Sequence, residues 1–212
     1  DPIHFLGFSR EEIIASVEEA ENAGTYVAAH LYTDDAIRRA LECGVHSLEH
    51  CNLITSKTAK FAVEKGAIAC PTLVTYEYLK IEGASLGLPQ VSVDKVDTVR
   101  LAGMKSLETM HKAKLTMAFG SDLLGEMHRH QSEEFVIRGR VLPAIEVIRS
   151  TSVHAAKLLR KSGQLGTVQT GAYADLILVD GDPLKDLSLL TKQGAHLPLI
   201  MQGGRLHKNA LK

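Results

Sequence analysis

The sequence lacks a surplus of either charge and lacks long apolar runs. Lys and Arg together number 24 and Asp and Glu 25 in 212 residues, a formal net charge of −1. This balance supplies neither the basic surface that binds nucleic acid nor an acidic tail, so we expect no nucleic-acid partner. No apolar run approaches the ~18 residues that cross a bilayer, and we expect no membrane partner.

Several N-terminal and motif signals are also missing. The first residues have no basic region, no apolar segment of a signal peptide and no initiating Met, so we expect a piece of a longer chain. Cys43, Cys51 and Cys70 form no paired spacing, which favours reduced thiols and a cytoplasmic location. The phosphate loop, the dinucleotide-binding glycine fingerprint and the nucleophile elbow are absent from the sequence.

An internal repeat of helix, glycine and strand is present from residue 9 to residue 72. Ser9 predicts a helix N-terminus because Glu12 completes a capping box. Each predicted helix ends at a glycine, which adopts the left-handed cap conformation at least cost. The sixth residue after each glycine ends a short apolar strand. The glycines are Gly24, Gly44 and Gly66, and the sixth residues are His30, His50 and Thr72.

The alternation of helix and strand in these units, with a period of 20 to 22 residues, predicts an α/β fold with a parallel sheet and crossover helices. Ligands collect at the C-terminal ends of such strands, and neighbouring strands lie about 4.8 Å apart. A fourth predicted strand, residues 114–122, ends in Asp122. Imidazole and carboxylate groups suit zinc and related ions, so His30, His50 and Asp122 are candidate metal ligands. The alternative is two hydrogen-bonded structural histidines and an aspartate that caps a helix.

Two further residues are candidates for binding substrate. Tyr32 lies two residues beyond His30, where its hydroxyl could face the same end of the sheet. The alternative is an aromatic side chain that packs at this end without binding substrate. His128 and His130 follow Asp122 in a polar segment, and both would face one side if that segment were extended. The alternative for this pair is a solvated loop.

The rest of the chain gives coarser predictions. His46 is expected to pack, and Glu49 to point away from His50 toward a flanking helix, since strand side chains alternate. Residues 73–93 have poor periodicity and predict a loop over the rim, a candidate lid. Helices are expected over 94–113 and 144–159, with a polar loop over 123–135. Short strands between glycine turns begin near Ser162.

Four segments together resemble the metal-dependent amidohydrolase superfamily. They are VAAHLYTDDAI, GVHSLEHCNLI, MAFGSDLLGEMHRHQSEEF and GQLGTVQTGAYADLILVDGDPL, and they cover nearly the whole chain in family order. The segment GEMHRHQ is similar to the imidazolonepropionase-related branch, which includes Xaa-Pro dipeptidases (prolidases), other dipeptide carboxypeptidases and ochratoxinase.

This resemblance implies a (β/α)8 barrel with a small β-sandwich. The strands ending at His30, His50, Thr72 and Asp122 would be its fifth to eighth. His30, His50 and Asp122 would bind the metal, and Asp122 would also shuttle a proton. The family's His-x-His pair and bridging lysine are missing here, and its chains are roughly twice as long. We therefore expect the C-terminal half of the barrel over 1–161 and part of the sandwich over 162–212.

The implied function is metal-dependent hydrolysis of an amide, most simply of an Xaa-Pro dipeptide. Zinc is the expected cofactor, as one ion or as two if the upstream ligands are supplied. The expected partners are the N-terminal half of the same protein, a small-molecule or dipeptide substrate, and further copies in a homo-oligomer. The alternatives are a deaminase or cyclic amidohydrolase of the superfamily, and a non-catalytic fragment.

Overall fold

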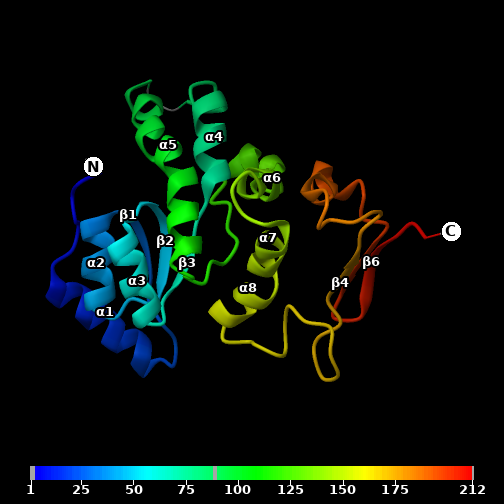
Figure 1. Cartoon of the computed structure of the whole chain (residues 1–212), viewed down its shortest axis with the longest axis horizontal. Coiled ribbons are helices and arrows are strands. Elements are labelled where there is room, and N and C mark those ends of the chain that lie inside the picture. Colours follow the sequence, from blue (N-terminus) through cyan, green and yellow to red (C-terminus); the bar gives the residue numbers. More distant parts are fainter. Residues whose placement is uncertain (1–2, 88–89, 212) are drawn as a thin grey trace.

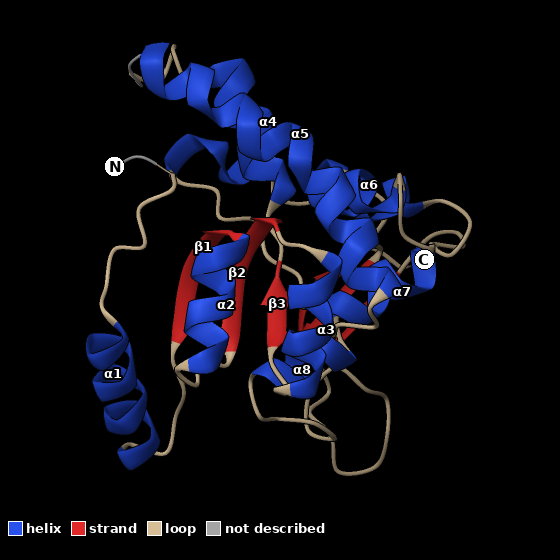
Figure 2. Cartoon of the chain, turned by 60° about the vertical axis from the view of Figure 1, so that its left-hand side comes forward, coloured by secondary structure: helices blue, strands red, loops and turns tan. Residues whose placement is uncertain are grey.

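Three parallel strands and their crossover helices form the N-terminal part of the protein. The computed structural model describes residues 3–87 and 90–211, with the backbone alone for 90–95. Strands β1 (Ala28–Thr33), β2 (Ser47–Leu53) and β3 (Ile68–Cys70) pair in that order, all parallel. Helices α1 (Arg10–Asn22), α2 (Asp34–Glu42) and α3 (Ser56–Glu64) precede or connect them. Figure 1 shows α2 and α3 against the sheet, and Figure 2 shows α1 standing apart from the edge of β1.

The predicted helix boundaries of the repeat are confirmed. Ser9 caps α1 and forms the capping box with Glu12, and Thr33 caps α2 by accepting from the Ala36 N–H. The three glycines that follow the helices adopt positive φ angles of 70°, 93° and 67°. These caps are local interactions, which is why the sequence alone predicts them.

The predicted fourth strand is reduced to a short pairing beside β3. Met117 forms a single parallel bridge with Ala69. The Ala69 N–H donates to the Thr116 carbonyl (3.0 Å), and the Ala118 N–H donates to the Ala69 carbonyl (2.8 Å). The order of the four parallel units therefore agrees with the prediction, although the fourth unit forms only one bridge in the described structure.

The predicted loop over residues 73–93 is wrong over its first half. Residues Leu73–Glu82 form helix α4, which packs against α5 (Gln90–Lys112) as a hairpin that projects beyond the sheet. Four consecutive residues of α4 are buried, from Leu73 to Tyr76, so the segment has no amphipathic period. Residues 90–93, at the end of the predicted loop, are also helical and belong to α5, while residues 88–89 lie outside the described residues.

The segment after Asp122 is also more helical than predicted. Residues Gly125–His130 form a 3-10 helix (η1), and Glu133–Gly139 form α6, where a polar loop was expected. The single helix expected over 144–159 is divided into α7 (Ala144–Thr151) and α8 (Val153–Leu158). Ser152 interrupts it with ψ −96°, and its carbonyl oxygen lies where a side chain on Gly166 would clash.

A buried ion pair on α6 ties the ends of two strands together. The Arg138 Nε donates to Glu134 Oε1 (2.7 Å), and both side chains are fully buried. Arg138 also donates to the carbonyls of Ala118 (2.9 Å) and Pro71. Glu134 Oε2 accepts the Val74 N–H at the start of α4 (2.7 Å). Burial raises the pKa of the Glu134 carboxyl, and the Arg138 guanidinium opposes that rise.

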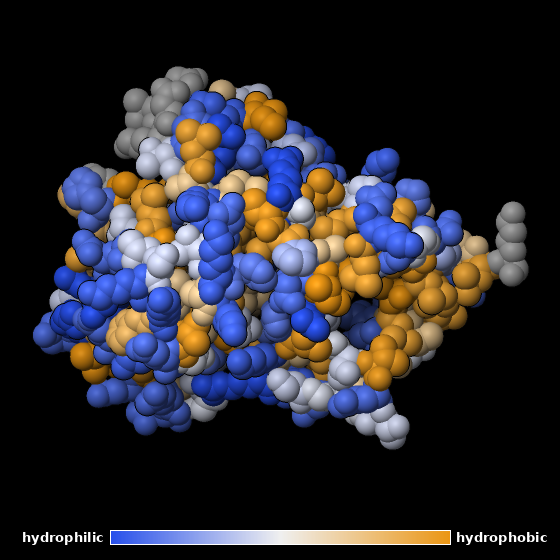
Figure 3. All heavy atoms as spheres, viewed as in Figure 1, coloured by the Kyte–Doolittle hydropathy of each residue, from blue (hydrophilic) through white to orange (hydrophobic). Residues whose placement is uncertain are grey.

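The C-terminal part of the chain is a separate antiparallel sheet. Strands β4 (Leu176–Leu178), β5 (Leu199–Gln202) and β6 (Arg205–Asn209) pair in sequence order, and short 3-10 turns η2 (Leu187–Leu190) and η3 (Lys192–Gly194) lie between β4 and β5. Orange residues cover much of this region in Figure 3, and Ile177 and Leu206 are about half exposed. The predicted short strands are present, but they begin at Leu176 rather than near Ser162, and residues 163–175 form turns and irregular structure. The domain boundary stays a prediction.

The main core lies between the sheet and its helices and contains Leu31, Leu48 and Ala69 from the three strands. Among residues 3–87 and 90–211, no helix combines the length and apolarity that a membrane crossing requires.

We expect Arg138→Met to lower the free energy of unfolding by about 3–5 kcal/mol, because it leaves the Glu134 carboxyl buried without its partner. Urea unfolding of the protein measures this value. In the double variant Glu134→Leu/Arg138→Met, the free energy of unfolding should fall by less than the sum of the falls in the two single variants. Arg149→Met, which breaks a half-exposed pair with Glu146 (2.7 Å), is the control and should change stability by about 0–1 kcal/mol. If Arg138→Met lowered the free energy of unfolding by less than about 1 kcal/mol, the assignment of Glu134 and Arg138 as a buried ion pair would be contradicted.

Candidate active site

The two repeat histidines meet at the C-terminal ends of β1 and β2. His30 Nδ1 lies 2.7 Å from His50 Nε2, and the ring centroids are 4.9 Å apart. His50 is almost fully buried, whereas His30 is exposed. Asp122 Oδ2 lies 4.0 Å from His50 Nε2, and its side chain is 41% exposed. The structure therefore brings His30, His50 and Asp122 together, as the sequence predicted, and their metal-binding role stays a prediction.

The equal positions of His30 and His50 in the repeat suggest that the two residues lie opposite each other, and the pairing of the strands shows that they do not. In the parallel ladder Leu31 pairs with His50, and His30 pairs with Glu49. His50 reaches His30 because its backbone leaves the strand conformation, with φ 73° at His50 and φ 57° at Cys51. Left-handed backbone is uncommon in residues other than glycine, and each such residue costs roughly 1–3 kcal/mol. The strained pair rotates the imidazole of His50 onto the face that His30 occupies.

The prediction for Glu49 is wrong for the same reason. Glu49 pairs with His30 on one side and with Cys70 on the other, which places all three side chains on one face of the sheet. The helix-facing core contains Leu48 instead. Glu49 accepts from the Ser47 hydroxyl, and the buried Cys70 thiol has its pKa raised to about 12 by burial and by Glu49. His46 packs edge-on against Tyr26, in agreement with its predicted packing role.

Thr72 and Tyr76 complete the surroundings of His50. Thr72 Oγ1 lies 2.8 Å from His50 Nδ1, which leaves the Nε2 nitrogen toward His30 and Asp122. Burial, with a smaller contribution from His30, lowers the pKa of His50 to about 4, so that its imidazole is neutral at pH 7. The position of Thr72 in the repeat was the signal for its role, whereas Tyr76 was hidden in the segment predicted to be a loop.

Tyr32 lies beside His50 at the C-terminal ends of the strands, where the sequence predicted it. Its ring stacks on His50, with centroids 4.9 Å apart and an angle of 9° between the planes. Burial raises the pKa of the Tyr32 hydroxyl, which keeps it a neutral hydrogen-bond donor. Its role in binding substrate stays a prediction.

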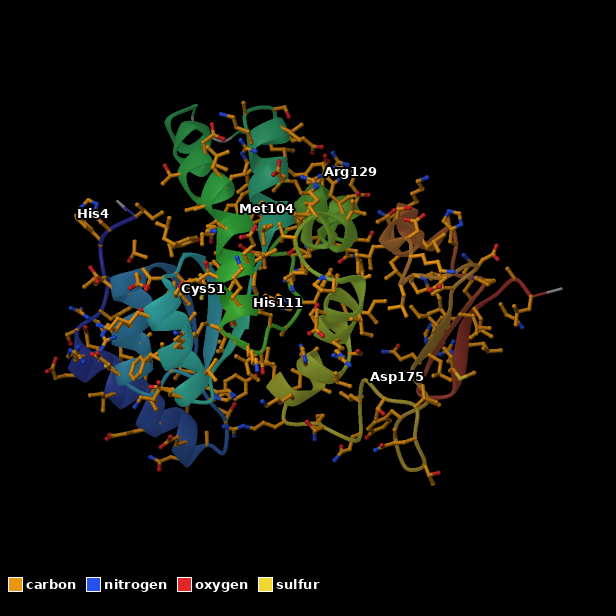
Figure 4. The ribbon with its side chains drawn as sticks, in the orientation of Figure 1. His4, Cys51, Met104, His111, Arg129 and Asp175 are labelled. Carbon is orange, nitrogen blue, oxygen red and sulfur yellow. The ribbon has the colours of Figure 1, made fainter. Side chains whose placement is uncertain are left out.

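His128 is exposed on η1, and no contact of the described side chains joins it to His30, His50 or Asp122. The helical turn removes the extended geometry on which the pairing with His130 depended. His130 bonds Glu82 (2.9 Å) and stacks on Tyr78. Arg129, labelled in Figure 4 near α4, also bonds Glu82 (2.6 Å). This segment therefore fastens η1 to the helical hairpin, and the substrate role of His128 stays a prediction.

The donors present fit part of a metal site. One imidazole nitrogen of His30 and one of His50 lie side by side, and the ring of His50 is neutral. The Thr72 hydroxyl bonds the second ring nitrogen of His50, as residues that orient metal-binding histidines do. In the described part of the chain, however, no group of three or more His, Cys, Asp or Glu side chains is close enough to hold an ion. A complete site requires further donors or a small movement of Asp122.

The pKa of His50 predicts how stability depends on pH. The unfolded histidine takes up its proton near pH 6.5 and the folded one near pH 4, so acid favours the unfolded state between these values. We expect the free energy of unfolding in metal-free protein to fall by roughly 3 kcal/mol from pH 6.5 to pH 4 on account of this residue. Urea unfolding of the chain together with its N-terminal half, across that pH range and with a chelator, measures the slope.

The variant His50→Asn should lose this part of the slope, and His4→Asn, which changes an exposed histidine, should keep it. Equal slopes in His50→Asn and the parent protein would show that His50 is not held neutral by the fold.

The chain resembles known amidohydrolases along its whole length. Residues 1–206 match the amidohydrolase family. Ochratoxinase of Aspergillus niger is 26% identical over 209 residues, which are 98% of this chain and 43% of that protein.

Two solved structures share the fold. A prolidase complexed with N-methylphosphonate-L-proline is 48% identical with a TM-score of 0.96, covering 99% of this chain and 51% of that chain. A Xaa-Pro dipeptidase with bound methionine is 27% identical with a TM-score of 0.85, covering 95% of this chain and 49% of that chain. The chain thus spans about half the length of these relatives. The predicted resemblance is confirmed, and the chain belongs to the amidohydrolase family.

Proposed function

We propose that this chain is the C-terminal half of a metal-dependent amidohydrolase that cleaves dipeptides. The observation that carries the proposal is the meeting of His30, His50 and Asp122 at the ends of parallel strands. The 48% identity to a prolidase structure supports the dipeptidase reading over a deaminase or a cyclic amidohydrolase. Zinc as the ion, a cytoplasmic location and a homo-oligomer of the whole protein belong to the same proposal.

His30, His50 and Asp122 would hold a divalent ion, with further ligands from the other half of the protein. Such an ion polarises a substrate carbonyl and lowers the pKa of water, which makes hydrolysis feasible near neutral pH. Thr72 fixes the ring of His50 in the orientation that leaves Nε2 available. The low pKa of His50 keeps its imidazole neutral, so that one of its two ring nitrogens is free to bind an ion.

Asp122 is suited to move the proton. As water attacks the amide carbon, a carboxylate oxygen of Asp122 accepts the proton that the water releases. The same oxygen then delivers this proton to the amide nitrogen as the carbon–nitrogen bond breaks, so that one residue acts first as base and then as acid. Its partial exposure leaves the carboxylate reachable from the mouth. Tyr32, stacked on His50, and His128 on η1 would orient the free carboxylate of the substrate.

The whole protein should lose nearly all turnover of Xaa-Pro dipeptides in the variant Asp122→Asn, because an amide cannot accept the proton. Its metal content should stay near that of the parent. Steady-state kinetics together with elemental analysis of the purified variant measure both quantities. Parental rates in Asp122→Asn would overturn the proton-transfer role. Cleavage of lactams or aryl amines without cleavage of dipeptides would favour the other branches of the family.

The open edges of the sheet support a partner that completes the barrel. Within the described residues, β1 pairs only with β2, and the fourth unit bridges only to β3. A hollow of about 320 Å³ lies between β1 and the N-terminal segment, with Leu6, Ile13 and Ala29 among the residues that line it. An unpaired strand edge beside an apolar slot is a site for strand addition. The N-terminal half of the same protein is the partner that we propose.

We expect residues 1–212 expressed alone to aggregate or to melt without cooperativity, because the strand edges and the face of the sheet lose their cover. Co-expression with the N-terminal half should yield a complex with a sharp melt and bound metal. Calorimetry and size-exclusion chromatography distinguish the two states. A monomeric fragment with a sharp melt and full metal loading would contradict the proposed partner.

A further inference from the structure

A large hollow lies directly beside the candidate active site. It has a volume of about 830 Å³, within the range of small-molecule sites. His30 and Tyr32 of β1 line it, so it is continuous with the residues proposed to act on the substrate. Tyr76 and Leu79 contribute from α4, which places the helical hairpin along one side.

The two sides of this hollow are apolar. Leu79, Val96 and Val99 line it from the α4–α5 hairpin. The N-terminal segment, which carries the labelled His4 in Figure 4, contributes Phe5 and Phe8. These phenylalanines are 59% and 66% exposed, an unusual degree for such large apolar side chains unless a ligand or another chain covers them.

The hollow offers few charges to balance a charged ligand, and among its described lining residues His4 and His30 are the side chains that can become cationic. Its lining residues include no Asp, Glu, Lys or Arg within the described part of the chain. A charged side chain that entered would lose its hydration without gaining an ion pair, which is unfavourable. An uncharged apolar side chain would instead gain contact with both sides of the hollow.

Tyr76 contributes a polar group to this mainly apolar hollow. Its hydroxyl is buried and has no hydrogen-bond partner in the described structure. The Tyr32 and Thr72 hydroxyls are close neighbours of this group, but neither forms a hydrogen bond of normal geometry with it, and burial raises the pKa of Tyr76 strongly. The ring stands edge-on to His50, with centroids 6.1 Å apart. A buried hydroxyl left unpaired is costly, so this group is free to donate to a ligand atom beside His50.

We propose that this hollow is the subsite for an apolar side chain of the substrate and that the Tyr76 hydroxyl donates a hydrogen bond to the substrate next to His50. The inference rests on the proposed function, because it concerns the substrate of the same site. It assigns the substrate class as amides with an uncharged apolar side chain, such as leucyl or phenylalanyl dipeptides. Dipeptides with an Asp or Lys side chain should be poorer substrates, because no Asp, Glu, Lys or Arg among the described residues lines the hollow.

The test compares the whole protein with the variants Leu79→Ala and Ile81→Ala on dipeptides that carry Leu, Gly, Asp or Lys at either position. The parent should show at least a tenfold higher kcat/KM for Leu than for Gly at one position, and lower values for Asp and Lys. Leu79→Ala should reduce that preference about tenfold. Ile81→Ala removes a similar side chain from the same helix at a position that is 69% exposed, and it should preserve the preference.

The hydroxyl is tested with Tyr76→Phe, with Tyr173→Phe at an exposed position as control. Tyr76→Phe should lower kcat/KM at least tenfold while its melting temperature stays equal or rises, since the unpaired buried group is gone. A purely structural tyrosine would give no such loss. Unchanged kcat/KM in Tyr76→Phe would overturn its assignment as a donor.

The subsite is tested without turnover by measuring the binding of free leucine and of free glycine by NMR. If the whole protein cleaves no dipeptide, the proposed function fails, yet tighter binding of leucine that Leu79→Ala abolishes would still support the subsite. Equal binding of the two amino acids, or equal kcat/KM for Leu and charged dipeptides, would overturn it.

Discussion

The buried ion pair of Glu134 and Arg138 is the constraint on which the rim of this sheet depends. One guanidinium joins the carbonyls at the ends of β3 and of the following unit, and the paired carboxylate holds the first turn of α4. The loops that carry Thr72 and Asp122 leave the sheet at these points. Two fully buried charges are rarely a net gain in stability, so we interpret the pair chiefly as a device that fixes geometry.

The second constraint acts within β2. An alternating strand would direct His50 away from the face that His30 occupies, because neighbouring residues on a strand point to opposite sides. The left-handed conformation of His50 and Cys51 removes that conflict. The hydrogen bond between Thr72 and His50 and the stacking of Tyr32 then hold the ring in place, so several packed contacts offset the strain of the backbone.

The same arrangement leaves surfaces that the chain does not cover by itself. The edge of β1, the apolar hollow beside His30 and the exposed face of the C-terminal sheet all have apolar or unpaired groups at the surface. The chain spans about half the length of its relatives, and we propose that the N-terminal half of the protein covers the edge of β1 and the C-terminal sheet. The hollow differs from the other two because it adjoins the candidate catalytic residues, which is why a ligand is its natural occupant.

The sequence by itself determined the helix caps, the order of the parallel units and the selection of His30, His50 and Asp122 as candidate site residues. Caps, glycine ends and strand-end residues depend on neighbours only a few positions away in the chain, which is why the sequence records them. Only the tertiary structure decided the register of His50 with Leu31, the helical state of α4 and the inward position of Glu49. Each of these depends on contacts between residues some 20 to 60 positions apart in the chain. Such contacts override local propensity, and no pattern within one segment records them.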